Sequence, residues 1–275
     1  MKIHFTKMSG AGNDFVVVDN RSGIISDPHS FSNTVCNRRL GIGADGVLLL
    51  ERSDISGFTM KYYNADGSNA GMCGNGGRCI AKFAYDNSVV TSDNFSFEAF
   101  GHIYESTRID STLFDLKMKN PFDVKLNQEI SLDSTTVKAN YINTGTDHSV
   151  IFLDDNSQLG TLESADIFGI GKKIRYHNIY QPKGTNVNFV SKLTDNIIQI
   201  RTYERGVEDE TLACGTGSVA SAILSSMKYQ MKSPIRVKVL SGEFLEISFQ
   251  KTINNFFDVR LKGSAKVTFY GEIDI

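Results

Sequence analysis

The sequence predicts an α+β protein built from two similar units. Each half of the chain has a cysteine in a CGxG segment, and 141 residues separate Cys73 from Cys214. The turn glycines of the hairpins expected after these segments, Gly101 and Gly242, are also 141 residues apart. In both halves strands precede the CGxG segment and a helix follows it. The repeated order indicates an internal duplication rather than a short solenoid repeat, with the two equivalent loops facing one cleft.

In the first half, short apolar runs alternate with glycine-rich turns. After Cys73 the apolar positions change to helical spacing, which predicts a helix from Gly74 that ends near Asn87. Alternating strands follow from Phe95 to Met118, and the polar segment 119–127 is interpreted as a crossover between domains. The remaining elements expected in this half are strands at 2–5, 15–19, 47–51 and 58–64 and a helix at 28–39.

The second half repeats this order. The helix expected at 218–227 is small or apolar on nearly every face, which is typical of a helix enclosed by other structure. Strands are expected at 186–190, 197–205, within 235–249 and at 256–261, with a turn at Asn254 and Asn255. The predicted domains are therefore 1–119, to which a final strand at 264–275 returns, and 120–263.

The composition argues against several classes of function. The 275 residues carry a formal net charge of -2 with dispersed Lys and Arg, so no basic surface for nucleic acid is expected. No apolar run approaches the ~18 residues of a membrane span, and the N-terminus lacks the apolar core of a signal peptide. The four cysteines have neither a disulfide pattern nor zinc spacing. We expect reduced thiols, no metal, a cytoplasmic location and a small polar substrate.

The CGxG loops favour acid–base chemistry. A cysteine just before a helix lies near unpaired backbone N–H groups and the positive end of the helix dipole, which lower its pKa from ~8.5. The same N–H groups, at 74–76 and 215–217, can hold a carboxylate. Two opposed thiols could then remove a proton from one face of an α-carbon and deliver another to the opposite face. Pyridoxal phosphate is not expected, because no lysine and phosphate-loop combination is present.

Several residues also have ordinary structural interpretations. Cys36 and Cys79 lie in apolar-periodic segments, which favours packing over chemistry. Asn13, Asn64, Asn186 and Asp66 can equally be turn residues, and His148 can be a hydrogen-bonded core histidine.

Four segments, MSGAGNDF, YYNADGSNAGMCGNGGRC, KGTNVNF and TYERGVEDETLACGTG, together resemble the diaminopimelate epimerase family over nearly the whole chain. The resemblance implies two pseudo-symmetric domains, each a mostly antiparallel sheet around a central helix, with the active site in the cleft between them. It also implies cofactor-independent interconversion of LL- and meso-2,6-diaminoheptanedioate in lysine and peptidoglycan precursor synthesis. A homodimer is left open.

By this resemblance Cys73 and Cys214 match the two bases, and His148 matches a motif histidine that supports them. Three departures, Gly46, Thr146 and Asp147, concern the substrate contacts: many members have DQ where this chain has Asp45 and Gly46, and GNPH where it has 145–148. The residues expected to bind substrate are Asn13, Asn64, Gly74, Asn75, Asn186, Glu204, Arg205, Gly215 and Thr216.

Three alternatives share parts of this pattern. A racemase of the same superfamily, acting on proline, hydroxyproline or histidine, would use the same two thiols. A thiol hydrolase would pair one cysteine with His148 and leave the second cysteine without a role. A binding protein with an inactive cleft would use neither.

Overall fold

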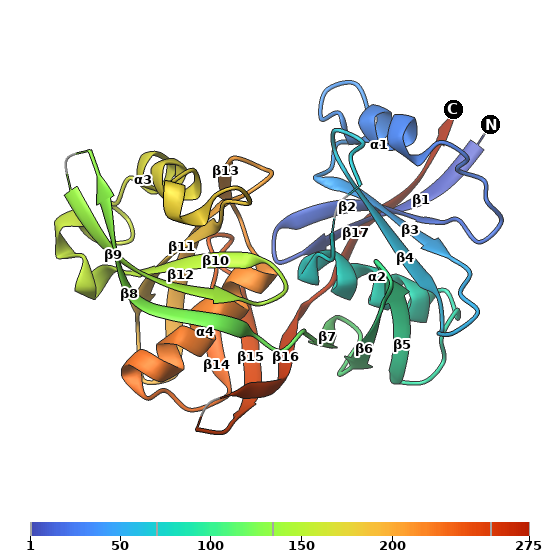
Figure 1. The fold of residues 1–275 in the computed structure, drawn as a ribbon. Helices are drawn as coiled ribbons and strands as arrows, with labels where there is room; N and C mark the ends of the chain where they lie inside the picture. The colour runs from blue at the N-terminus through green and yellow to red at the C-terminus, as the bar shows by residue number, and fades with distance from the viewer. Residues whose placement is uncertain (1, 70, 134, 254, 275) are drawn as a thin grey trace. The chain divides into compact units, whose positions relative to one another are not determined.

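The computed structural model describes residues 2–69, 71–133, 135–253 and 255–274. The chain divides into two compact units (Figure 1). Unit 1 contains residues 1–117 and 262–275, and unit 2 contains residues 118–261. Among the described residues, no helix has the length and apolar character needed to cross a membrane.

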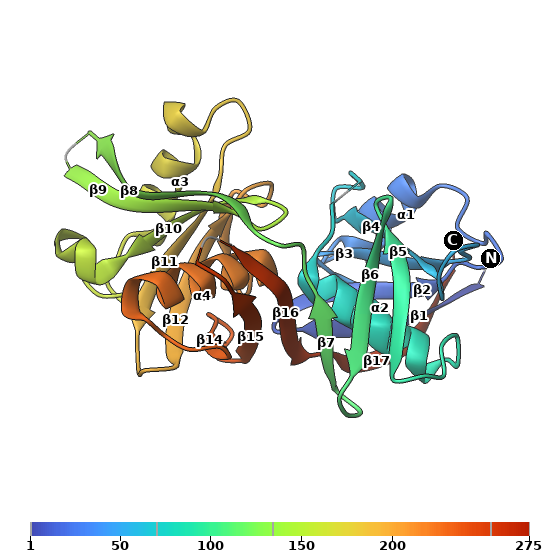
Figure 2. The same ribbon diagram turned by 60° about the horizontal axis from the view of Figure 1, so that its bottom comes forward.

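Unit 1 is a mixed sheet with a buried helix against it. The strands lie in the order β17-β1-β2-β3-β4-β5-β6-β7, with the pairs β2–β3 and β4–β5 parallel and the other neighbouring pairs in this order antiparallel. Helix α2 (Gly74–Asp86) is buried from Gly74 to Ala84 and packs mainly on β1, β2 and β7, with β6 also beside it (Figure 2). The other elements are β1 (Lys2–Gly10), β2 (Asn13–Asp19), α1 (Pro28–Cys36), β3 (Gly46–Glu51), β4 (Thr59–Asn64), β5 (Asn94–Ala99), β6 (His102–Arg108), β7 (Leu113–Lys117) and β17 (Lys266–Asp274).

Unit 2 has the same kind of sheet around helix α4 (Gly215–Tyr229). Its strands lie in the order β8-β9-β10-β11-β12-β14-β15-β16, with β13 paired to β12 as well. The pairs β10–β11 and β12–β14 are parallel. The elements are β8 (Phe122–Leu132), β9 (Thr135–Asn143), β10 (Asp147–Phe152), α3 (Ile167–Arg175), β11 (Asn186–Lys192), β12 (Ile197–Glu204), β13 (Asp209–Thr211), β14 (Ile235–Lys238), β15 (Phe244–Lys251), β16 (Phe256–Ser264) and the short 3-10 helices η1 (Leu153–Asp155), η2 (Ser157–Leu159) and η3 (Asn178–Tyr180).

The two units repeat one order of strand pairing. The sequence β1-β2-β3-β4-β5-β6 pairs as antiparallel, parallel, antiparallel, parallel, antiparallel, and β9-β10-β11-β12-β14-β15 pairs in the same order. Gly101 and Gly242 both have positive φ in the hairpin turn that follows each central helix. The predicted α+β fold with two similar units is confirmed.

The interpretation of 119–127 as a crossover is wrong from Phe122 onward. This segment is the start of β8, which pairs with β9 and has register irregularities at Phe122/Lys125 and Lys125/Gln128. Because its residues up to Asn127 are exposed, the segment lacks the apolar alternation of a half-buried strand. The structure also extends β1 to Gly10 and ends α1 at Cys36, and it adds β9, β10 and α3, which the sequence patterns did not predict. Asn254 of the predicted turn lies outside the described residues, and Asn255 hydrogen-bonds Thr252.

Candidate active site

Cys73 and Cys214 are the N-cap residues of the two central helices. Both have extended backbone conformations, with φ and ψ of -107° and 120° for Cys73 and -116° and 114° for Cys214. The Sγ of Cys73 accepts the backbone N–H of Gly76 at 3.4 Å, and the Sγ of Cys214 accepts that of Gly217 at 3.4 Å. Each thiol therefore lies at the positive end of a helix dipole, which favours the thiolate form. The two predicted helix starts are confirmed.

Glycine is required at the third residue after Cys214. A Cβ at Gly217 would overlap the Oδ1 of Asn188 and lie 3.2 Å from the Sγ of Cys214. The equivalent Gly76 is less restricted, because its nearest neighbours are the ends of Leu48 at 3.2 Å and Met60 at 3.4 Å. The thiol of Cys214 and a buried asparagine thus share the space beside the first turn of α4.

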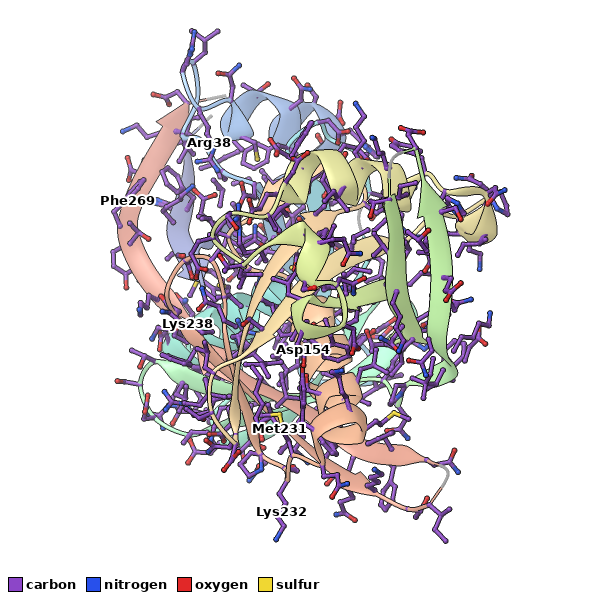
Figure 3. All side chains as sticks on the ribbon, turned by 90° about the vertical axis from the view of Figure 1, so that its left-hand side faces the viewer. Arg38, Asp154, Met231, Lys232, Lys238 and Phe269 are labelled. Atoms are coloured by element: carbon purple, nitrogen blue, oxygen red, sulfur yellow. The ribbon has the colours of Figure 1, made fainter. Side chains whose placement is uncertain are left out.

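In unit 1, Asn13 lies beside Cys73. The thiol of Cys73 is 3.5 Å from the Oδ1 of Asn13, and the Nδ2 of Asn13 donates to Asp45 at 2.5 Å. Arg38, which is labelled in Figure 3, bridges Asp45 and Asp14 with two contacts of 2.7 Å. Asp45, one of the two positions at the DQ departure, therefore fixes the orientation of the Asn13 amide.

The remaining predicted residues of unit 1 occupy the loop and helix start around Cys73. Asn75 is 1% exposed, and its Oδ1 accepts a hydrogen bond from the guanidinium of Arg78 at 2.9 Å. Arg78 also donates to the carbonyl of Gly74 at 3.2 Å and is itself fully buried. Asn64 ends β4 and donates to the Oγ of Ser68 at 3.0 Å. Asp66 accepts the N–H of Ser68 at 2.8 Å, which is a turn contact.

In unit 2, Asn186, Asp147 and Arg205 form one cluster. The Nη1 of Arg205 donates to the Oδ2 of Asp147 at 3.1 Å and to two backbone carbonyls, and the Oδ1 of Asn186 accepts the N–H of Arg205 at 2.9 Å. Burial acts to raise the pKa of Asp147, but hydrogen bonds from Tyr141, Arg205 and Asn143 hold it below the usual value. Asp147 is therefore a carboxylate at neutral pH. Glu204, at the end of β12, accepts the hydroxyl of Thr211 at 2.8 Å.

His148 is fully buried on β10 and neutral. Its Nδ1 lies 3.0 Å from the Nδ2 of Asn188, and its Nε2 lies 2.9 Å from the Oγ1 of Thr146. Burial lowers the pKa of His148 to about 3, with a smaller contribution from the charge of Arg205, against which Asp147 acts. His148 is thus a hydrogen-bonded core histidine, and Thr146 connects it to Thr216 at 3.2 Å.

The other two cysteines are packing residues. Cys36 and Cys79 are 3% and 0% exposed, and burial raises the pKa of the Cys36 thiol to about 12. A thiol with this pKa supplies almost no thiolate at neutral pH. Among the described residues, no group of three or more His, Cys, Asp or Glu side chains is arranged to hold a metal ion.

Several residues of these clusters were not predicted from the sequence. Asn188 lies two residues after Asn186 in β11, so both side chains are on one face of the strand. Two polar residues on the same face of a buried strand were an available signal for a hydrogen-bonded network. Arg78 gave no such signal, because its position in α2 resembles that of any charged residue near a helix start.

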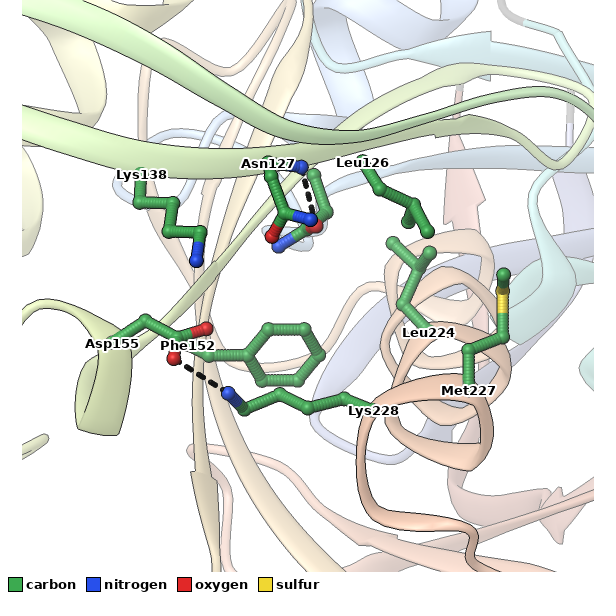
Figure 4. Close-up of a pocket in the computed structure, with 9 residues that line it drawn as sticks. Leu126, Asn127, Lys138, Phe152, Asp155, Leu224, Met227 and Lys228 are labelled. Carbon is green, nitrogen blue, oxygen red and sulfur yellow. Dashed lines mark hydrogen bonds and ion pairs between the residues drawn. The ribbon is translucent and has the colours of Figure 1, made fainter.

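Two pockets in unit 2 lie outside the thiol environment. One, of about 230 Å³, lies between α4 and neighbouring strands and contains none of the predicted site residues (Figure 4). The other, of about 280 Å³, is bordered by Asp147, Tyr141 and Gly184. The second pocket therefore adjoins the Asp147–Arg205 pair.

Comparison with known proteins decides the family. A family model described as diaminopimelate epimerase matches residues 5–112 and 140–266. The chain belongs to the diaminopimelate epimerase family. The diaminopimelate epimerase of Chlorobaculum tepidum is 40% identical over 98% of this chain and 100% of that protein. That of Methanocella arvoryzae is 40% identical over 100% of this chain and 98% of that protein. Membership of this family of isomerases confirms the resemblance found in the sequence.

Solved structures support the fold independently. A probable proline racemase from Agrobacterium radiobacter K84 has a TM-score of 0.75 at 14% identity, covering 99% of this chain and 93% of that one. A PhzF-family phenazine biosynthesis protein from Bacillus anthracis has a TM-score of 0.75 at 12% identity, with both chains covered completely. At this low identity the similarity concerns the fold alone.

Proposed function

We propose that this protein interconverts LL- and meso-2,6-diaminoheptanedioate by two-base proton transfer at one α-carbon. The observation that carries the proposal is the repeated N-cap cysteine, Cys73 on α2 and Cys214 on α4, in a member of the diaminopimelate epimerase family. A thiolate removes the α-proton, and the thiol on the opposite face donates a different proton. The reaction needs no net oxidant or reductant, because the proton removed and the proton delivered balance.

The helix starts supply the electrostatic part of the reaction. Removing an α-proton places negative charge on the substrate carboxylate, which backbone N–H groups can stabilise. The first turns of α2 and α4 present such groups at Gly74 and Asn75 and at Gly215 and Thr216. The proposal assigns the reacting carboxylate to these groups, and it uses no cofactor as an electron sink.

The distal end of the substrate is assigned to Arg205, Glu204 and the asparagines Asn13, Asn64 and Asn186. Arg205 suits a carboxylate because its planar guanidinium forms two parallel hydrogen bonds, and Glu204 suits an ammonium group. We further propose a small-molecule substrate and a cytoplasmic site of action, where thiols stay reduced.

Incubation with LL-diaminoheptanedioate in deuterated water tests the function. We expect one deuterium to enter at an α-carbon and the meso isomer to accumulate until both isomers are present. Proline, hydroxyproline and histidine serve as comparison substrates, and faster deuterium exchange into any of them would favour the racemase alternative. An ester or amide cleaved without α-deuteration would indicate a thiol hydrolase, and the absence of any exchange would contradict the proposal.

A further inference from the structure

A continuous chain of hydrogen-bonding side chains leads from the core of unit 2 to the thiol of Cys214. It begins at Thr202 on β12 and passes through Asn188 on β11 and His148 on β10. It continues through Thr146 and Thr216 and ends at the sulfur. The successive heavy-atom distances are 3.0, 3.0, 2.9, 3.2 and 3.6 Å.

The donors and acceptors around Asn188 give this chain one direction. The Nδ2 of Asn188 lies 3.3 Å from the carbonyl of Ser149, which can only accept a hydrogen bond. The same nitrogen therefore donates to the Nδ1 of His148, while the Oδ1 of Asn188 accepts from Thr202. Because the neutral imidazole has one donor and one acceptor, its proton is on Nε2.

The direction continues through the two threonines. The Nε2–H of His148 donates to the hydroxyl of Thr146, whose own proton then points to Thr216. The hydroxyl of Thr216 is left to donate to the sulfur of Cys214. The hydroxyl of Thr144 donates to the backbone carbonyl oxygen of Thr216 at 3.1 Å and so holds the backbone of Thr216 in place.

We propose that Asn188, His148 and Thr146 are positioning residues that hold the hydroxyl of Thr216 as a hydrogen-bond donor to the Cys214 thiolate. The inference rests on the proposed function only in treating Cys214 as one of the two bases. No proton passes along the chain. His148 stays neutral, and the proton that Cys214 exchanges comes from or goes to the substrate. The chain favours the thiolate because a hydrogen bond to a charged acceptor is about twice as strong as one between neutral groups.

The charged groups near His148 are not part of this hydrogen-bonded chain. Asp147 and Arg205 are the two charges that act on the imidazole, and they pair with each other at 3.1 Å. Neither side chain forms one of the five links between Thr202 and Cys214. The hydroxyl of Thr146 is therefore a position at which the chain can be broken without changing any charge.

Thr146→Val, with Thr146→Ser as its matched control, tests the chain by thiol reactivity. Both are made in the full chain carrying Cys73→Ala, and iodoacetamide alkylation of Cys214 is followed at neutral pH by mass spectrometry of its peptide. We expect Thr146→Val to slow alkylation by up to about tenfold, because the hydroxyl of Thr216, no longer held by Thr146, can turn away from the sulfur and stop donating to the thiolate. Thr146→Ser keeps the hydroxyl and should retain the parent rate. Equal rates for the Val and Ser variants would overturn the proposal.

Nitrogen NMR of the His148 ring tests the direction without any activity measurement. The chain requires a proton on Nε2 and none on Nδ1 in the wild-type protein. In Asn188→Asp the new carboxylate can only accept, so a proton should appear on Nδ1. A wild-type ring protonated on Nδ1 would overturn the proposal. Deuterium exchange into diaminoheptanedioate by the wild type tests the proposed function separately. A failure of the hydrogen-bonded chain can therefore be distinguished from a failure of the proposed function.

Discussion

Replacing Gly217 with Ala should destabilise unit 2, while the equivalent Gly76→Ala in unit 1 should have a much smaller effect. The methyl group at Gly217 overlaps the Oδ1 of Asn188, whose side chain is fully buried and hydrogen-bonded to Thr202 and His148. At Gly76 the methyl meets the flexible ends of Leu48 and Met60 at 3.2 and 3.4 Å, and the ring of Phe15 at an ordinary contact distance of 3.5 Å. The two positions follow Cys214 and Cys73 by the same three residues, so helix propensity and capping are matched.

The expected magnitude comes from three contributions. Overpacking a well-filled site costs about 1–3 kcal/mol, and displacing Asn188 from a buried hydrogen bond costs about 1–3 kcal/mol more. Alanine recovers about 1 kcal/mol of helix propensity relative to glycine. The net loss at Gly217 is about 1–5 kcal/mol. At Gly76 the same gain offsets a smaller steric term, so its net effect should lie within about 1 kcal/mol of zero.

Urea denaturation followed by tyrosine fluorescence measures both variants, since the chain has ten tyrosines and no tryptophan. If the two units unfold in separate transitions, the Gly217→Ala shift should appear in only one of them. The reasoning is refuted if both variants lose the same stability, or if Gly217→Ala is as stable as the wild type.

Three further predictions concern catalysis, substrate recognition and acid stability. Cys73→Ala and Cys214→Ala should each reduce epimerisation by orders of magnitude, measured as the meso isomer formed, while Cys79→Ala should retain most of the activity. Full activity in Cys73→Ala or in Cys214→Ala would contradict a two-base reaction. Arg205→Ala should lower kcat/KM for diaminoheptanedioate by an amount equivalent to about 2–5 kcal/mol, and Arg205→Lys should recover only part of it; equal kcat/KM in wild type and Arg205→Ala would remove Arg205 from the site. Burial acts to raise the pKa of Asp14, but hydrogen bonds from Arg38 and Lys7 hold it at about 2. About 2 kcal/mol of stability should therefore be present above pH 4 and lost as the pH falls towards 2. The urea midpoints of the wild type and Asp14→Asn should therefore converge as the pH falls over this range. A difference between the two midpoints that stays constant would contradict the prediction.

The sequence was sufficient where local chemistry decides the structure. A cysteine followed by small residues and then by helical apolar spacing predicts an N-cap, and both Cys73 and Cys214 have that role. The sequence was insufficient for β8, because strand pairing rather than apolar alternation defines an exposed strand. The Arg205–Asp147 pair joins residues 58 apart in the chain, and no periodicity indicates such a contact. For His148, the ring is buried and hydrogen-bonded on both sides, which fits a core histidine and also the positioning role proposed above.

The Arg205–Asp147 pair restricts how Arg205 can take part in substrate recognition. The side-chain hydrogen bonds from Arg205 to Asp147, Lys183 and Gly184 all use Nη1. A guanidinium has five N–H donors, and its Nε and Nη2 together form the side that binds a carboxylate through two parallel hydrogen bonds. Asp147 therefore fixes the plane of the guanidinium without using that side. A carboxylate at Asp147 is consequently compatible with Arg205 as the anion-binding residue that we propose.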